Sequence, residues 1–299
     1  MDITLKQLEA LVWVADLGSF RRAAERLNTT QPNISTRIAT LENQLGVTLM
    51  ERDAGSVRLT VKGAELLGHA RKVLGASENL IAATGDPGLL SGTLRLGVTE
   101  MIVHTWLHQF LNMLKQRFVN LVVELTVDMS VILEAALVDR SIDLALQNGP
   151  FERISSGEID LGVYPSTWAA SPELGLADDA VAFEDLAAHP ILTHARDTRY
   201  FREVSEHFRT AARIVPSSNL AACQHMALNG MGIALLPEAM IAKELRDATL
   251  VPVAYGWRPN DMQFYARWDR ERAASVVAAA AALAAEVSAD FLRASGEFK

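Results

Sequence analysis

Residues 20 to 63 read FRRAAERLNTTQPNISTRIATLENQLGVTLMERDAGSVRLTVKG, and this stretch decides the fold of the first part of the chain. Two helical patterns are separated by the short polar turn Asn28–Thr30. In the second pattern, Ile34, Ile38 and Leu41 recur with helical spacing, which predicts one buried face. Two short helices joined by a tight turn predict a helix-turn-helix.

The other face of the second helix carries short polar groups and one arginine near the helix start. These residues are Gln31, Asn33, Ser35, Thr36 and Arg37. Thr30 is placed to cap this helix, and Pro32 stands near its first position, where no N–H donor is needed. A helix that reads a major groove needs such groups at its amino end. The alternative is a small helical hairpin with a solvated polar face, because motif matches of this kind include false positives.

The surrounding sequence favours the DNA-reading interpretation. Residues 2–20 form an amphipathic helical pattern, and Gly46 stops the second helix of the motif. Residues 49–52 and 57–60 flank a turn-rich tip at 53–56, which predicts a short hairpin. We therefore expect a winged helix-turn-helix.

In these residues the chain resembles the LysR-type transcriptional regulators. The matching positions are Leu8, Phe20, Ala23, Ala24, Leu27, Gln31, Pro32, Ser35, Ile38, Leu41, Glu42, Leu45, Gly46, Leu49, Arg52, Leu59, Thr60 and Gly63. The resemblance spans the whole DNA-binding region, and the length and order of elements beyond it also fit the family.

The resemblance implies which residues face DNA. The expected base-edge residues are Gln31, Ser35 and Arg37, with Pro32 beside them, and the expected phosphate contacts are Thr30, Arg52 and Arg58. Two departures concern the reading helix and its core. Thr36 and Arg37 stand where many members have an arginine and then a polar residue, so the base preference differs. Met50 replaces a frequent phenylalanine, which we interpret as a core change.

The charge distribution is consistent with a nucleic-acid partner only locally. The 299-residue chain has a formal net charge of −8. Residues 20–62 nevertheless carry seven basic and four acidic side chains, so the acidity lies elsewhere. A modest basic patch suits a protein that binds DNA as a dimer or tetramer, because several weak DNA contacts then act together.

A helical pattern over residues 62–83 is too long to bury itself inside a small domain. The resemblance identifies it as the linker helix that pairs with its mate in a dimer, and residues 85–88 form a hinge-like break. We expect a DNA-binding domain at 1–61, the linker and hinge at 62–88, and an effector-binding domain at 89–299. Within the last of these, lobe I is expected at 92–163 and 267–299 and lobe II at 164–266.

Strands alternate with helices after residue 92, which predicts βαβ units and a parallel sheet. Strands are expected at 93–98, 121–127, 142–146, 159–164, 190–193, 232–237 and 262–268, with helices at 101–118 and 131–139. The overall expectation is an α-rich winged helix-turn-helix followed by a two-lobed α/β domain, similar to periplasmic binding proteins.

Ligands of such sheets lie at the carboxyl ends of the strands, in the cleft. This rule selects Thr99, Glu100, Ser130, Gln147, Asn148, Thr193 and His194 as effector-binding candidates. A hydroxyl at such a place can also simply cap its helix. Glu100 stands apart because a carboxylate repels an anionic effector. It either opposes its own helix dipole, or faces an effector with an amine, or is neutralised by an arginine such as Arg199.

Glu100, His104 and His108 share one helical face, but three ligands over two turns converge poorly on one ion, so no metal site is expected. Cys223 is the single cysteine; it excludes an intrachain disulfide switch and is interpreted as a small buried residue. No nucleophile elbow, phosphate loop or metalloprotease motif is present, so neither catalysis nor a cofactor is expected.

The function expected is that of a LysR-type regulator whose promoter binding or activation responds to a small molecule in the cleft between the lobes. Its partners are double-stranded promoter DNA, the effector, RNA polymerase and further copies of itself, as a homodimer or homotetramer. The start of the chain lacks a signal-peptide pattern, and the alanine-rich run at 273–285 is interpreted as a packed helix, so a cytoplasmic protein without a membrane partner is expected. The alternative is an architectural DNA-binding protein without an effector.

Overall fold

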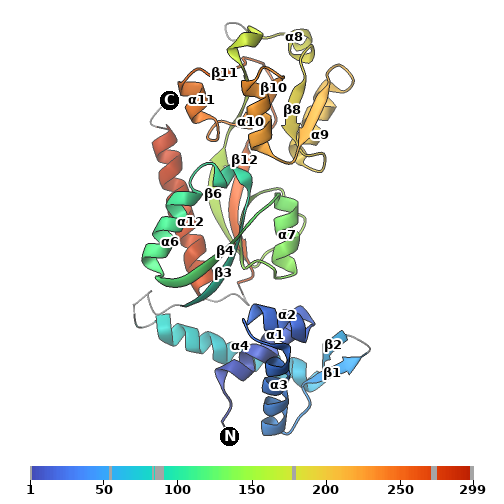
Figure 1. Cartoon of the computed structure of the whole chain (residues 1–299), viewed down its shortest axis with the longest axis vertical. Coiled ribbons are helices and arrows are strands. Elements are labelled where there is room, and N and C mark those ends of the chain that lie inside the picture. Colours follow the sequence, from blue (N-terminus) through green and yellow to red (C-terminus); the bar gives the residue numbers. More distant parts are fainter. Residues whose placement is uncertain are drawn as a thin grey trace. The chain divides into compact units, whose positions relative to one another are not determined.

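The computed structural model describes residues 2–53, 56–82, 84, 91–176, 180–270 and 275–296. The chain forms two compact units (Figure 1). The first consists mainly of residues up to 92, and the second contains most of the residues that follow.

The first unit contains the predicted winged helix-turn-helix. Its elements are α1 (Leu5–Leu17), α2 (Phe20–Arg26), α3 (Gln31–Leu45), β1 (Met50–Asp53), β2 (Ser56–Leu59) and α4 (Val61–Ala82). Each of the first three helices is capped by the hydroxyl group of the residue before it, which accepts a backbone N–H of the first turn. The capping residues are Thr4, Ser19 and Thr30. Gly18 and Gly46 end α1 and α3 in the left-handed conformation, as the sequence predicts for Gly46.

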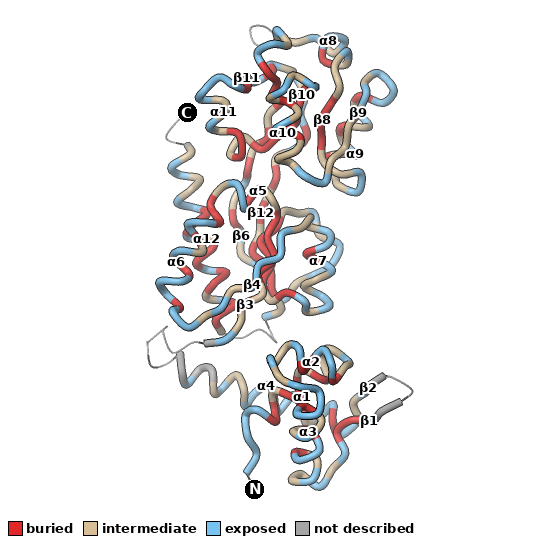
Figure 2. Tube along the Cα trace, viewed as in Figure 1, coloured by how far each residue is buried: buried red, intermediate tan, exposed pale blue. Residues whose placement is uncertain are grey.

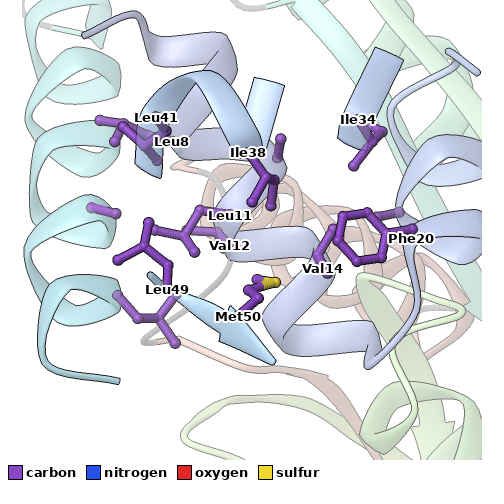
Figure 3. Packing of buried hydrophobic residues seen from close by; sticks show 14 of the residues in the cluster. Leu8, Leu11, Val12, Val14, Phe20, Ile34, Ile38, Leu41, Leu49 and Met50 are labelled. Carbon is purple, nitrogen blue, oxygen red and sulfur yellow. The ribbon is translucent and has the colours of Figure 1, made fainter. Parts of the chain in front are cut away.

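The core of the first unit lies among α1, α2, α3 and the start of the wing (Figure 3). Its labelled residues are Leu8, Leu11, Val12, Val14, Phe20, Ile34, Ile38, Leu41, Leu49 and Met50. Full burial of one such side chain stabilises the fold by about 2 kcal/mol. Met50 is among the buried residues, as expected for a position in the core.

Helix α4 packs against α1, and its residues up to Leu74 contribute to the core of the first unit. Leu67 and Ala70 are buried there, and Arg71 forms an ion pair with Asp16 of α1. Further along, Val73 is 48% exposed and Leu80 is 73% exposed. Val73 and Leu80 are therefore apolar side chains that the described part of this chain leaves open to solvent. The predicted hinge at 85–88 lies outside the described residues.

The second unit has two lobes, each built on a five-stranded sheet. The first sheet has the order β4-β3-β5-β12-β6, formed by Asn120–Val127, Ser91–Val98, Leu144–Asn148, Met262–Trp268 and Gly157–Tyr164. Its helices are α5 (Glu100–Val103), α6 (Leu107–Arg117), α7 (Ser130–Val138) and α12 (Ser275–Gly296). In Figure 1, α6 and α12 lie on one side of this sheet and α7 on the other.

The second sheet has the order β11-β7-β10-β8-β9, formed by Val251–Pro252, Ser166–Ala170, Ile233–Pro237, Ile191–His194 and Ile214–Ser217. The helices of this lobe are α8 (Phe183–Ala187), α9 (Arg199–Phe208), α10 (Leu220–Leu228), α11 (Ala242–Arg246) and the 3₁₀ turn η2 (Pro172–Leu174). The buried residues of both lobes follow the strands (Figure 2). The chain crosses between the lobes from β6 to β7 and again from β11 to β12.

The two-lobed α/β architecture is confirmed, but three details of the prediction are wrong. The sheets are mixed rather than parallel, because β12 returns antiparallel to β5 and β6, and β7 is antiparallel to β10. The lobe limit expected at residue 266 falls inside β12, which pairs over its whole length in the first sheet. The helix expected at 101–118 is interrupted between α5 and α6, where Trp106 is buried and donates its Nε1–H to the Tyr164 hydroxyl at 2.7 Å.

Helix α12 is long and apolar enough, by length and composition alone, to cross a membrane. In this fold its apolar side is covered by the first lobe. The buried residues are Val276, Val277, Ala280, Ala281, Leu283, Ala284 and Val287. Ser288 forms hydrogen bonds to the Tyr164 hydroxyl and the Leu161 carbonyl oxygen. The prediction of a packed terminal helix is therefore consistent with the structure.

Gly63 in the first turn of α4 has no room for a side chain. A Cβ atom there would overlap the carbonyl group of Leu49, which is backbone and cannot rotate away. We predict that Gly63→Ala lowers the free energy of unfolding of the first unit by more than about 2 kcal/mol. Gly68→Ala in the same helix is the matched control, because its Cβ meets nothing within 4 Å; it should stabilise by up to about 1 kcal/mol. Thermal unfolding of both variants tests this, and equal melting temperatures would contradict it.

Candidate nucleic-acid interface and ligand cavity

The amino end of α3 presents an exposed polar surface. Gln31, Pro32, Asn33 and Thr36 are exposed, and Ser35 is half-buried. Thr30 is exposed as well, and its Oγ1 accepts the Asn33 N–H at 3.4 Å. The face is held in place by local bonds, since the Thr36 hydroxyl donates to the Pro32 carbonyl oxygen at 3.0 Å.

Arg37 is less exposed than the first residues of this face. The residue is half-buried, and its guanidinium is close enough to Glu9 of α1 to affect that carboxyl group. Burial raises the pKa of Glu9, and the positive charges of Arg37 and Lys6 offset part of this rise. Its neighbour Thr36 is exposed. Thr36 is expected on the polar face but not among the DNA contacts, although helical spacing from Ile34 and Ile38 places it opposite the buried face.

The wing is a two-stranded hairpin held to α3 by one carboxylate. Glu42 accepts the backbone N–H groups of Leu49 at 2.7 Å and Met50 at 3.1 Å, and so fixes where β1 starts. Arg58 is exposed on β2, and it stands opposite Glu51 in the register of the two strands. The side chain of Arg52, the other predicted wing contact, lies outside the described residues.

The second unit contains a cavity of about 800 Å³ between its lobes, at the carboxyl ends of the strands. Five of the seven predicted effector-binding residues line it: Thr99, Glu100, Ser130, Asn148 and His194. Gln147 and Thr193 are fully buried and lie outside the lining. The reason is strand geometry, because neighbouring side chains on a strand point to opposite faces. Gln147 and Asn148 therefore cannot both face the cavity, and neither can Thr193 and His194.

Several polar atoms at these strand ends are buried without a protein partner. They are Thr99 Oγ1, Gln147 Oε1 and Nε2, Thr193 Oγ1 and His194 Nε2. A buried polar group without a hydrogen bond costs about 1–3 kcal/mol, so water or a ligand is expected to supply the missing partners. Atoms of this kind come from both lobes.

Ser130 and Asn148 bind each other across the cavity wall. The Ser130 hydroxyl donates to Asn148 Oδ1 at 2.8 Å and accepts the Asn148 backbone N–H at 3.2 Å. The Asn148 amide also donates to the Gly149 carbonyl oxygen at 3.2 Å. Both side chains therefore position the end of β5 in addition to facing the cavity.

Glu100 reaches from the first lobe to the second. Its carboxylate accepts the backbone N–H of Leu220 at 2.6 Å and that of Ala221 at 3.0 Å, which are the first two residues of α10. It thus stands at the amino end of α10 and not only at that of its own helix, α5. Arg199 lines the cavity too, but it forms an ion pair with Glu203 and donates to the Asn260 carbonyl oxygen at 2.8 Å.

The wall loop at 149–153 is held by a buried arginine that sequence reasoning missed. Arg267 of β12 is 2% exposed, forms an ion pair with Glu134, and lies 3.7 Å above the ring centre of Phe151. Glu134 also accepts the backbone N–H groups of Glu152 and Arg153. An arginine between the apolar residues Ala266 and Trp268 of β12 is the signal that could have identified this anchor.

The metal and thiol hypotheses can be compared with the described residues. His104 Nε2 lies 3.6 Å from Glu100 Oε1, while His108 stands on α6 beyond the helix break and contacts Asn112. No group of three metal-ligating side chains occurs among the residues that the structure describes. Cys223 is buried in α10, and burial raises the pKa of its thiol to about 11. Such a thiol is not activated for oxidation.

Comparison with known proteins identifies both units. Residues 5–64 match the family model described as "Bacterial regulatory helix-turn-helix protein, lysR family", and residues 87–289 match "LysR substrate binding domain". The chain belongs to the LysR family of bacterial transcriptional regulators. The resemblance in the DNA-binding region is thereby confirmed, and with it the function of a LysR-type regulator that has an effector-binding domain.

Relatives of known name cover most of this LysR-family chain. The transcriptional regulator CfxR of Cupriavidus necator is 30% identical over 259 residues, which cover 82% of this chain and 78% of CfxR. A full-length OxyR variant from Pseudomonas aeruginosa has a TM-score of 0.62 at 23% identity, covering 96% of this chain and 95% of OxyR. LysG from Corynebacterium glutamicum, solved with bound effector arginine, has a TM-score of 0.61 at 19% identity, covering 96% and 98%.

His194 predicts how the stability of this LysR-type chain depends on pH. Burial lowers the pKa of His194 to about 4. The folded chain therefore protonates this histidine at a lower pH than the unfolded chain, in which the pKa is near 6.5. The neutral His194 side chain therefore contributes fully to the free energy of unfolding above about pH 6.5, and this contribution is lost as the pH falls toward 4. We expect a loss of about 2 kcal/mol in this window, because the ring keeps some contact with the cavity.

Urea unfolding at pH 7 and pH 4.5, followed by tryptophan fluorescence, measures this loss, since four of the five tryptophans lie in the second unit. His194→Gln should lose less stability than the unsubstituted chain over the same interval. The same pH dependence in both proteins would contradict the prediction.

Proposed function

We propose that this LysR-family chain binds promoter DNA through α3 and the wing, and that a small molecule in the cavity between the lobes of the second unit controls this binding or the activation that follows. The observation that carries the proposal is the cavity of about 800 Å³, with unpartnered buried polar atoms from both lobes. A cavity of this size accommodates a small metabolite. An architectural protein without an effector would have no use for it.

The DNA interface follows from exposure and chemistry. We assign base-edge contacts to Gln31, Ser35 and Arg37, with Thr36 and Pro32 on the outward face of α3. Short polar side chains at a helix amino end reach base edges in a major groove. We assign phosphate contacts to Thr30, Arg52 and Arg58, because hydroxyl and guanidinium groups beside the helix and on the wing are placed to bind the DNA backbone.

The exposed second half of α4 supports a dimer. Apolar side chains such as Leu80 gain burial only if another chain covers them. We therefore propose that residues 62–88 form the dimerisation linker between a DNA-binding domain at 1–61 and an effector domain at 89–299. In a dimer, two DNA-binding domains contact the phosphates of two half-sites, and in a dimer of dimers four such domains bind DNA together.

The effector side of the proposal places ligand contacts at Thr99, Glu100, Ser130, Asn148 and His194, with Gln147 and Thr193 behind them. The arginine bound to LysG supports the general principle of a small-molecule effector. A ligand changes the DNA complex only if it binds one arrangement of the lobes more tightly than another. The further proposals are that the chain acts in the cytoplasm, contacts RNA polymerase at the promoter and carries no enzyme activity.

DNA footprinting on the intergenic region beside its own gene, over a series of salt concentrations, tests the function. We expect protection of a dyad-symmetric site, with affinity that falls steeply as salt rises. Weak and uniform binding to every duplex would contradict sequence-specific recognition.

Substitutions separate base reading from phosphate binding. Gln31→Ala and Ser35→Ala should each weaken binding to the dyad site by about 1–3 kcal/mol and leave binding to random duplex unchanged. Arg58→Ala should weaken both and reduce the slope of log K against log salt by about 1 for each protomer bound. Arg293→Ala is the control, since this exposed arginine is paired with Asp290 in the second unit. An effect of Arg293→Ala as large as that of Arg58→Ala would contradict the assignment.

A further inference from the structure

The contact of Glu100 with α10 joins two elements that are 120 residues apart in the chain. Glu100 begins α5 of the first lobe, and its side chain is 18% exposed. Both carboxylate oxygens are used, one for the N–H of Leu220 and the other for the N–H of Ala221. A carboxylate that accepts two backbone N–H groups forms charge-assisted bonds, which are shorter and stronger than neutral ones.

The amino end of α10 is fully occupied by side chains of the protein itself. Asn219 caps the helix by accepting the Ala222 N–H at 2.6 Å, so Asn219 and Glu100 together take the N–H groups of residues 220 to 222. The free N–H groups and dipole of a helix start attract an anion. Here Glu100 supplies that anion from the opposite lobe, in the wall of the cavity.

The charges around the cavity do not favour a second anion beside Glu100. Asp128, Glu152 and Asp197 also line the cavity, so carboxylates outnumber the two arginines of the wall. Of these arginines, Arg199 is engaged by Glu203 and by main-chain oxygens, and Arg202 supplies the remaining positive charge. Glu134 is balanced by Arg267. Among the residues that the structure describes, no lysine or arginine forms an ion pair with Glu100. An organic anion at this point would therefore meet a carboxylate instead of helix N–H groups.

We propose that Glu100 is a built-in substitute for a ligand carboxylate: it occupies the anion-binding end of α10, clasps the two lobes together without a ligand, and restricts the effector to uncharged or cationic small molecules. This inference rests on the proposed effector cavity and narrows its ligand class. The polar atoms without partners in the cavity wall, on Thr99 and His194, are neutral groups that suit such a ligand.

Hydrogen–deuterium exchange of the full-length chain tests the clasp directly. In Glu100→Ala the amides at the start of α10 lose their acceptor, so a peptide covering residues 219–222 should exchange faster, on the order of tenfold. Acetate at about 100 mM should restore the protection in the variant, because it fits the vacated anion site. Acetamide, its uncharged counterpart, should not. The unsubstituted chain should respond to neither probe.

Two further variants make the result specific. Glu100→Gln keeps the shape and one acceptor oxygen but loses the charge, and it should give intermediate exchange. Glu124→Ala removes a carboxylate of the same lobe that pairs with Arg95 away from the cavity, and it should leave the α10 peptide unchanged. If Glu100→Ala loosens the whole lobe, peptides of β3 and β5 exchange faster too, and Glu100→Gln then decides the question. Unchanged exchange in Glu100→Gln and Glu100→Ala overturns the proposal, as does protection of the unsubstituted chain by acetate.

Pairs of an acid and its amide test the ligand class by thermal shift. Benzoate and acetate should stabilise the unsubstituted chain no more than benzamide and acetamide, and this order should reverse in Glu100→Ala. A carboxylate that stabilises the unsubstituted chain more than its amide overturns the restriction to uncharged or cationic ligands. None of these measurements uses DNA, so failure of the clasp and failure of promoter binding are observed separately.

Discussion

The buried hydroxyl of Tyr164 must be hydrogen-bonded, and the arrangement of the second unit depends on the residues that supply its hydrogen-bond partners. Trp106 Nε1 donates to it at 2.7 Å, and the hydroxyl lies 2.6 Å from Ser288 Oγ, which in turn donates to the Leu161 carbonyl oxygen at 2.5 Å. All donors and acceptors are therefore satisfied when the Tyr164 hydroxyl donates to Ser288, so that each bond points from the indole toward the carbonyl oxygen. Burial raises the pKa of Tyr164, so the hydroxyl keeps the proton that this chain of bonds requires.

This bonding chain connects three elements that are distant in the sequence. Tyr164 ends β6, where the backbone crosses to the second lobe, Ser288 lies in α12, and Trp106 stands between α5 and α6. Burying Trp106 interrupts the helix after Val103, so α5 remains a short segment at the edge of the cavity. Glu100 therefore projects across the cleft to α10 from a segment whose end is fixed by the core of the first lobe.

The first unit depends on local interactions to a much greater extent. Thr30 caps α3, Gly46 ends it, and Glu42 fixes the start of the wing within eight residues of its own position. Such contacts are encoded by residue type and spacing, which is why the winged helix-turn-helix could be predicted from the sequence with its elements in the correct places. Arg37 shows the limit of this method, because its approach to Glu9 of α1 depends on how two helices pack.

The sequence by itself determined the class of each unit, the stripe of apolar residues that buries α3, and the strand ends where a cavity had to be. These features follow from periodicities of 3.6 and 2 and from capping residues, which act over a few positions. Only the tertiary structure decided that β12 returns antiparallel into the first sheet and that Glu100 binds the start of α10. Each of these depends on backbone groups far apart in the chain, whose meeting is set by the packing of whole elements and not by any local pattern.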